Sequence, residues 1–241
     1  GQVCDVVLAD PDRRLIVVSA PGKRHKDDIK VTDLLIACAE ARLEGKPTDA
    51  PLGAVMARYR EIQEVLGVDA AIIDTISANL AEILAGSTEH RERFMDAVKA
   101  AGEDNCARLV AAELQRRGVK ARYLNPGEAG LLLSDEYGNA RLLPESYDNL
   151  ATLREAEGIT IFPGFFGYTR EGEVVTFPRG GSDITGAILA AAVKADLYEN
   201  FTDVDFVCAV DPSLADDVKP ITEMTYREMR ELSYAGFSGL H

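Results

Sequence analysis

The sequence predicts an α/β fold whose mainly parallel sheet is covered by helices on both faces. Short runs rich in β-branched and aromatic residues alternate with helical stretches over much of the chain. The segment from Pro47 to Gly118 has a helical pattern nearly throughout, which predicts an additional helical layer or subdomain. The chain has 241 residues, 46% of them hydrophobic, and no internal repeat or dividing linker. This is enough for one large core or two small ones.

The first predicted elements are a strand and a helix separated by a charged loop. "RRLIVVSAPGKR" has a β-branched apolar centre closed by Ser-Ala-Pro-Gly, which predicts a buried strand running into a loop through "KRHKDDIK". "VTDLLIACAEARLEG" has helical spacing, with Thr32 or Asp33 as a natural N-cap and Gly45 as its end. In the helical segment that follows, we expect interruptions at "EGKPTDAP", "LGVD", "AGSTEH" and "AAGED".

The second half of the chain alternates strands and helices. The β-rich runs are "VKARYLNP", "GITIFPGFFGYT", "GEVVTFPRGG" and, as a further strand or pair, "LYENFTDVDFVCAVDP". The helical stretches between and after them are "SYDNLATLREAEG", "SDITGAILAAAVKA" and "TYREMRELSYAGFS". This alternation is what predicts the mainly parallel sheet.

Composition excludes several classes of function. The formal charge of −14 repels polyphosphate backbones and anionic lipid, so we expect no nucleic acid and no membrane among the partners. The four cysteines form no CxxC pair and the three histidines no HxxxH pair, so neither a disulfide framework nor a zinc site is indicated. No apolar run is long enough to span a membrane, and the first residues lack the pattern of a signal peptide. We therefore predict a cytoplasmic protein and no bound metal site of its own.

One turn concentrates residues that suit an anionic ligand. In "VVTFPRGGSDITGAILAAAVKA", Gly180 and Gly181 form the predicted turn between a strand and a helix, and Ser182 or Asp183 caps the helix. Backbone N–H groups at a helix start bind anions, and the fork of Arg179 suits a carboxylate or phosphate. The alternative is that Arg179 is a surface charge and the Ser-Asp pair is only an N-cap.

The sequence around this turn resembles those of the aspartokinases of the amino-acid kinase superfamily. The resemblance covers Ile159 to His241 closely, through Gly-Phe-x-Gly, Arg-Gly-Gly-Ser-Asp, Thr-Asp-Val-Asp, Asp-Pro and a closing Leu-His, in that order. It extends to "LIVVSAPGK" with "VTDLLIACAE", and to "AGED". It implies a three-layer α/β/α sandwich, the amino-acid kinase fold. The implied reaction converts ATP and L-aspartate to ADP and 4-phospho-L-aspartate, the first step towards lysine, threonine and methionine, with Mg²⁺ bound through the ATP phosphates.

The resemblance also assigns site residues. Arg179 would clamp a carboxylate of aspartate with Ser182 and Phe165 beside it, and Asp183 would organise the catalytic centre. The aspartate pocket would also include Thr32 and Glu103, with Glu103 facing the substrate ammonium. The implied nucleotide-binding residues are Ser19, Thr202, Asp203, Cys208, Asp211 and Pro212. The alternatives are that Thr32 is only an N-cap, Glu103 only a solvated charge, and the Thr202–Asp203 pair only a turn.

Parts of the chain depart from the family pattern. Aspartokinases begin with a strand carrying Lys-Phe-Gly-Gly and continue into paired ACT domains, whereas this chain opens at "GQVCDVVLAD" and stops at His241. We therefore expect one catalytic domain over residues 1–241, with neither feature. In the nucleotide half, Phe206, Cys208 and Ser213 stand where the family usually has a glycine, an aromatic and a basic residue.

Other functions stay open at this point. Another amino-acid kinase fold member would phosphorylate glutamate, carbamate or a nucleoside monophosphate, and the Arg-Gly-Gly-Ser-Asp turn favours aspartate over these. A non-catalytic fragment or regulatory subunit would bind ligand only. The expected partners are therefore L-aspartate and ATP, with a homo-oligomer as a possible assembly.

Overall fold

The computed structural model describes residues 1–201 and 221–234 of the chain. It divides into two units, Gly1–Asp196 and Leu197–His241. The described part of the second unit contains one helix, α8 (Tyr226–Tyr234), inside the last predicted helical stretch. Most of the predicted strand region "LYENFTDVDFVCAVDP" lies outside the described residues. All the other described helices and strands lie in the first unit.

The centre of the first unit is a three-stranded parallel sheet in the order β1-β3-β2. Its strands are β1 (Leu15–Val18), β2 (Ala121–Tyr123) and β3 (Ile159–Pro163). Ile16 is opposite Ile161 in the β1–β3 pair, and Tyr123 is opposite Ile161 in the β2–β3 pair. The prediction of a parallel sheet is therefore confirmed, with each strand inside a β-rich run.

The last two strands of this unit form a separate antiparallel pair, which the alternation did not predict. They are β4 (Phe166–Tyr168) and β5 (Val174–Thr176), with Gly167 opposite Val175. Only five residues separate the two strands, which is enough for a hairpin but not for the helical crossover that parallel strands need.

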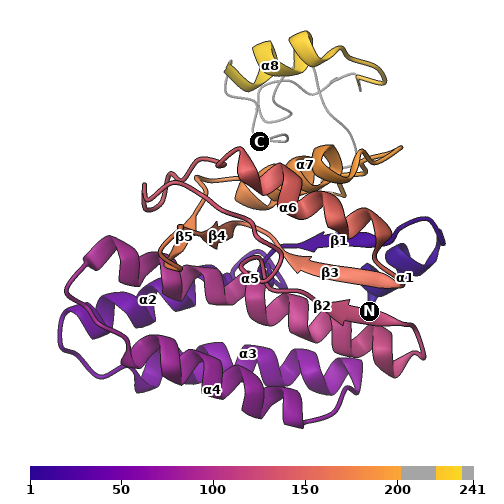
Figure 1. Cartoon of the computed structure of the whole chain (residues 1–241). Helices are drawn as coiled ribbons and strands as arrows, with labels where there is room; N and C mark the ends of the chain where they lie inside the picture. Colours follow the sequence, from indigo (N-terminus) through magenta and orange to yellow (C-terminus); the bar gives the residue numbers. More distant parts are fainter. Residues whose placement is uncertain (202–220, 235–241) are drawn as a thin grey trace, which may run out of the picture. The chain divides into compact units, whose positions relative to one another are not determined.

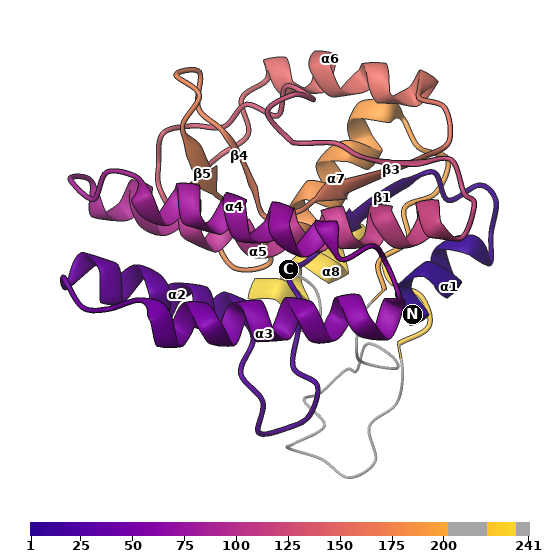
Figure 2. The ribbon, with the colours of Figure 1, turned by 90° about the horizontal axis from the view of Figure 1, so that it is seen from below.

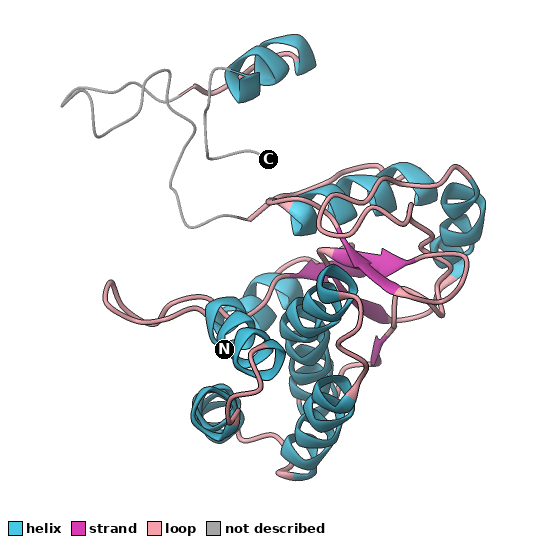
Figure 3. Cartoon of the chain, turned by 90° about the vertical axis from the view of Figure 1, so that its left-hand side faces the viewer, coloured by secondary structure: helices cyan, strands magenta, loops and turns pink. Residues whose placement is uncertain are grey.

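Helices cover both faces of the parallel sheet (Figure 1). One face carries α1 (Gln2–Leu8) and α5 (Arg91–Arg116), and the other carries α6 (Glu145–Ala151), the short 3-10 helix η1 (Thr152–Glu155) and α7 (Gly181–Val193). Successive strand residues face opposite layers: Ile16 packs in the core with α5, and Leu15 in the core with α7. Figure 3 shows the strands between the two helical layers, so the three-layer α/β/α prediction is confirmed.

A further helical layer packs on the outer side of α5. It consists of α2 (Val31–Leu43), α3 (Asp49–Leu66) and α4 (Ala71–Ala85), which share a hydrophobic core with α5 (Figure 2). The interruption predicted at "AAGED" is wrong, because α5 runs unbroken through it. Gly102 sits where α5 approaches the chain after β1, and this packing outweighs the low helical propensity of glycine.

The start of α2 also differs from the prediction. Its N-cap is Lys30, and both Thr32 and Asp33 lie inside the first turn, so neither caps the helix. Gly45 follows the C-cap with a φ of +68°, in agreement with its predicted role at the end of the helix. The interpretation of Thr32 as only an N-cap is therefore wrong.

Among the described residues, no helix is both long and apolar enough to cross a membrane.

Candidate active site

The candidate site lies at the carboxyl ends of β1 and β3. Because the two strands are parallel, the segments that follow them emerge at the same edge of the sheet. Ser19 and Ala20 follow β1, and Gly164 and Phe165 follow β3. The backbone N–H of Gly164 donates to the carbonyl oxygen of Val18 at 2.9 Å, which continues the pairing one residue beyond the strands.

Helices α2 and α5 meet the chain after β1 at this edge. A Cβ at Gly102 would lie 2.9 Å from Cβ of Ala20, 3.3 Å from Cδ1 of Leu35 and 4.0 Å from Oγ1 of Thr32. Only a glycine permits this approach without displacing a neighbour. The structure therefore brings Thr32 and Glu103 next to the Ser19–Ala20 segment, although they lie far apart in the sequence.

Glu103 is buried beside this segment. It is 6% exposed, and its Oε2 has no hydrogen-bond partner within the described part of the chain. Burial raises the pKa of its carboxyl to about 7, although the backbone N–H groups of Ala20 and of Glu103 itself lower it. The solvated-charge alternative is therefore wrong. A buried carboxylate with an unused oxygen is suited to bind a cationic group.

The start of α7 faces the end of β3. Its N-cap is Gly180, which has a φ of +83°, and the helix begins at Gly181. Ser182 and Asp183 therefore lie in the first turn, and the prediction that one of them caps the helix is wrong. Gly164 is packed against Ser182, because a Cβ at Gly164 would lie 2.7 Å from Oγ of Ser182.

Phe165 has an unusual backbone conformation between these elements. Its φ of +76° is rare for a residue other than glycine. Its N–H donates to Oγ1 of Thr185 in α7 at 3.1 Å, and its carbonyl accepts from the N–H of Phe177 at 2.8 Å. These bonds hold the chain in a conformation that is otherwise disfavoured, and such conformations are common at functional sites.

Replacing Gly164 with alanine should destabilise the protein by about 1–3 kcal/mol, because the new Cβ would overlap Ser182 and displace the start of α7. Urea unfolding would measure the change. Gly53→Ala in α3 is the matched control, since nothing lies within 4 Å of a Cβ there, and it should stabilise the fold slightly. Equal stability of the Gly164 variant and the wild type would contradict the tight contact.

The remaining predicted residues are placed unequally. Arg179 precedes α7, is exposed and, within residues 1–201 and 221–234, makes no hydrogen bond or ion pair. Asp183 is half-buried in the first turn of α7. Ser19 is exposed at the end of β1. The other proposed nucleotide-binding residues fall outside the described residues: Thr202, Asp203, Cys208, Asp211 and Pro212.

Three contributors to the site were missed at the sequence level. They are the backbone N–H of Ala20, the close approach of Gly164, and the hydroxyl of Tyr59, which donates to the carbonyl of Gly102 at 3.1 Å. The Gly-Phe-x-Gly segment was a usable signal for Gly164, because a glycine beside a strand often marks a close approach of the backbone. The Ala20 N–H and the Tyr59 hydroxyl depend on tertiary packing and left no local pattern.

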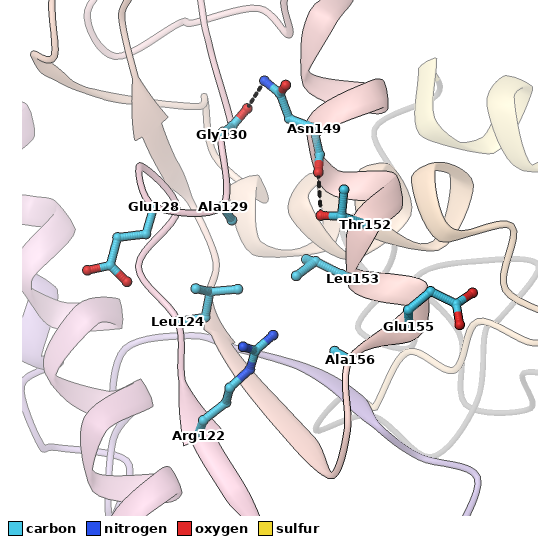
Figure 4. A pocket seen from close by; sticks show the side chains of 10 residues that line it. All are labelled: Arg122, Leu124, Glu128, Ala129, Gly130, Asn149, Thr152, Leu153, Glu155 and Ala156. Atoms are coloured by element: carbon cyan, nitrogen blue, oxygen red, sulfur yellow. Dashed lines mark hydrogen bonds between the residues drawn. The ribbon is translucent and has the colours of Figure 1, made fainter.

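A separate groove of about 660 Å³ lies between the end of β2, residues 128–130 and the α6–η1 segment (Figure 4). Arg122, Leu124 and Leu153 are among its lining residues. None of the predicted site residues lines it. The groove is therefore distinct from the candidate site.

Comparisons with known proteins agree with this arrangement. The family model described as "Amino acid kinase family" matches residues 4–241. The chain is 54% identical over 240 residues to Aspartokinase 3 of Bacillus subtilis, covering 100% of this chain and 53% of that protein. It is 36% identical over 163 residues to an aspartokinase of Geobacillus stearothermophilus, covering 68% of this chain and 40% of that protein.

Solved structures give the same result. An aspartate kinase of Clostridium acetobutylicum has a TM-score of 0.78 at 32% identity, covering 97% of this chain and 51% of that one. E. coli aspartokinase III in complex with aspartate and ADP has a TM-score of 0.78 at 28% identity, covering 99% of this chain and 53% of that one. The chain spans about half the length of the relatives named here, or less.

Proposed function

Because this chain belongs to the amino acid kinase family, we propose that it is the catalytic domain of an aspartate kinase, which transfers the γ-phosphoryl group of ATP to the side-chain carboxylate of L-aspartate. The observation that carries the proposal is the buried carboxylate of Glu103, whose Oε2 is unpartnered among the described residues, at the same strand edge as the start of α7. Aspartate has one ammonium and two carboxylates. A site with one buried acid and a helix start suits that pattern.

Each side chain has a defined task in this proposal. Glu103 binds the ammonium, and Arg179 holds a carboxylate with Ser182 and the N–H groups at the start of α7. Thr32 and Phe165 line the pocket, and Asp183 organises the reacting groups. The acceptor carboxylate is already an anion at neutral pH, so the transfer needs no strong base. It needs alignment of two anions and relief of their repulsion.

The nucleotide is the second substrate of the proposed reaction. Bound ATP would supply the phosphoryl group, and Mg²⁺ on its phosphates would offset their charge. In residues 1–201 and 221–234, no three His, Cys, Asp or Glu side chains are grouped to hold a metal ion, so Mg²⁺ there would need phosphate ligands as well. Ser19, exposed at the end of β1, is proposed to lie near the phosphates. The nucleotide-binding roles of Thr202, Asp203, Cys208, Asp211 and Pro212 remain predictions.

An acceptor screen tests the proposed function. Hydroxylamine traps an acyl phosphate as a hydroxamate, so the protein should form hydroxamate with Mg-ATP and aspartate. Glutamate, carbamate and nucleoside monophosphates would be compared through release of ADP. Turnover confined to another acceptor would contradict the aspartate assignment, and aspartate binding without turnover would favour a ligand-binding role instead.

Replacing Arg179 with lysine should raise the aspartate KM by about one to two decades, because lysine keeps the charge but loses one of two parallel hydrogen bonds to a carboxylate. The KM for ATP should barely change. Steady-state kinetics with each substrate varied in turn would measure both values. If the variant weakened ATP and left aspartate unaffected, the role of Arg179 would have to move to the nucleotide.

The cysteines support a cytoplasmic location within this proposal. Cys4, Cys38 and Cys106 are free thiols. Burial raises the pKa of the Cys38 thiol to about 11 and that of Cys106 to about 12, which keeps both protonated and unreactive. Free thiols are typical of a reducing compartment.

A further inference from the structure

Helix α3 contacts the proposed acceptor pocket through two consecutive side chains, although it belongs to the outer helical layer. Arg58 is 8% exposed, and its Nη2 donates to the carbonyl oxygen of Gly22 at 2.8 Å. Tyr59 is fully buried, and its hydroxyl donates to the carbonyl oxygen of Gly102 at 3.1 Å. Consecutive helical residues point about 100° apart, so one helix reaches two separate segments of the pocket.

The segment that Arg58 contacts is the loop after β1. Asp28 closes this loop by accepting hydrogen bonds from the backbone N–H of Arg24 at 2.9 Å and from its Nε at 2.8 Å. The guanidinium of Arg58 lies 3.6 Å from the same carboxylate. The N–H of Val31 donates to the carbonyl of Pro21 at 3.3 Å. The loop therefore has a defined shape, and Arg58 joins its first residues to α3.

The segment that Tyr59 contacts is the turn of α5 that carries Glu103. Gly102 lies next to Glu103 in the chain and packs against Ala20 and Thr32. A hydrogen bond to its carbonyl fixes the position of this turn relative to α3. Arg58 and Tyr59 thus act on the two sides of the close approach between Ala20 and Gly102.

We propose that Arg58 and Tyr59 are positioning residues of the acceptor pocket, which set the loop after β1 and the Glu103 turn of α5 at a fixed separation. This inference rests on the proposed function. The Nε of Arg58 is buried and, within the described residues, has no hydrogen-bond partner, which lowers the stability of the fold. A residue that destabilises the fold in this way is more readily explained by a role in the site than by packing. An apolar side chain of similar size would fill the space without that cost.

The test is the kinetic behaviour of Arg58→Met in the full-length protein. The KM for aspartate should rise about tenfold, because the loop that presents the Ala20 N–H loses its anchor. The acid limb of kcat/KM for aspartate should also move to higher pH, since the Ala20 N–H lowers the pKa of Glu103.

Other groups near Glu103 do not explain such a shift. Tyr59 on α3 and Cys106 on α5 share its surroundings, and burial raises the pKa of both, that of Cys106 to about 12. Asp104 is the next residue along α5, and it accepts hydrogen bonds from Tyr123 and Arg108 instead. A limb near neutral pH that is absent in Glu103→Gln and moves in Arg58→Met therefore reports on Glu103.

Three further variants make the test specific. Arg60→Met removes an exposed arginine from the same helix and should match the wild type. Arg58→Lys should recover part of the aspartate affinity that Arg58→Met loses. Tyr59→Phe, which removes one hydroxyl, should raise the aspartate KM but leave the hydrogen-exchange rate of the loop after β1 unchanged. Hydrogen exchange of residues 20–23 should quicken in Arg58→Met only.

The outcomes separate the two proposals. Wild-type turnover of aspartate with an unchanged aspartate KM and an unchanged acid limb in folded Arg58→Met and Arg58→Lys would contradict the positioning role alone. No turnover of aspartate by the wild type would contradict the proposed function and this inference with it. If Arg58→Met failed to fold, the lysine and phenylalanine variants would decide the matter by the same readouts.

Discussion

Replacing Glu103 with glutamine should lower kcat/KM for aspartate by about one to two decades, because the neutral amide cannot form a charged pair with the substrate ammonium. The wild type should lose activity towards acid pH as Glu103 is protonated near its pKa of about 7, and the variant should lack this limb. Kinetics between pH 5.5 and about 8.5 would measure both effects. A variant with the wild-type profile would remove Glu103 from the aspartate site.

The same substitution should stabilise the fold above neutral pH. The folded-state pKa of Glu103 lies above the ordinary value of 4.5, so its stabilising contribution is complete below about pH 4.5 and is lost as the pH rises through about 7. At pH 8 the buried charge costs up to about 3 kcal/mol, which glutamine avoids. Urea unfolding should show the largest gain at pH 8 and a much smaller gain at pH 5.

Glu113→Gln is the matched control on the same helix. The guanidinium groups of Arg116 and Arg117 hold the pKa of Glu113 near 2, although its burial acts in the opposite direction. A lowered pKa contributes stability that is present above about pH 4.5 and lost as the pH falls through about 2, so this variant should be less stable than the wild type at pH 8. At pH 8 the unfolding free energy should therefore rise in Glu103→Gln and fall in Glu113→Gln. Such opposite changes would distinguish the buried acid of the proposed site, Glu103, from the structural acid Glu113.

Replacing Asp183 with asparagine should reduce kcat at least about a hundredfold with little change in melting temperature. Asp183 lies in the first turn of α7, where a carboxylate gains about 0.3–1 kcal/mol from the helix dipole, and asparagine keeps the size and one acceptor oxygen of the side chain. Its proposed task is to organise the reacting groups, and that task needs the negative charge. Thermal melting and steady-state kinetics on the same sample would measure the two effects.

The control for this change is Asp74→Asn, because Asp74 is exposed in the first turn of α4 and belongs to the outer layer. It should lose a similar small amount of stability and no activity. Full activity in the Asp183 variant would show that the charge of this residue has no role in turnover.

Local patterns predicted most of the secondary structure. The β-branched runs gave β1 and β3 because parallel strands buried on both faces are almost continuously apolar. Helix starts were predicted less well, since α2 begins after Lys30 and α7 after Gly180, neither of which makes a side-chain cap. The "AAGED" interruption failed for a tertiary reason, because the close packing at Gly102 keeps α5 continuous.

Some residues of the candidate site were also identified from the sequence, whereas other features of the site depend on tertiary packing. Glu103, Thr32, Phe165 and Ser182 were identified by resemblance, and they lie around one edge of the sheet. The burial of Glu103 and the contact from α3 could not be predicted, because both depend on segments distant in sequence. The roles of Glu103, Thr32, Phe165 and Ser182 remain predictions. The same holds for Arg179, Asp183 and Ser19, and for the nucleotide-binding residues beyond residue 201.

Helix α5 fixes a distance inside the molecule. Asp96 accepts hydrogen bonds from the N–H groups of Gly138 and Thr176, and so holds the hairpin strand β5, while Glu103 lies seven residues later at the candidate site. Seven residues are close to two full turns, so both carboxylates project from one side of the helix, about 10 Å apart along its axis. A single inserted residue between them would rotate one by about 100° relative to the other. The spacing between the hairpin and the candidate site is thus encoded as a count of residues, which side-chain substitutions leave intact and a one-residue insertion or deletion does not.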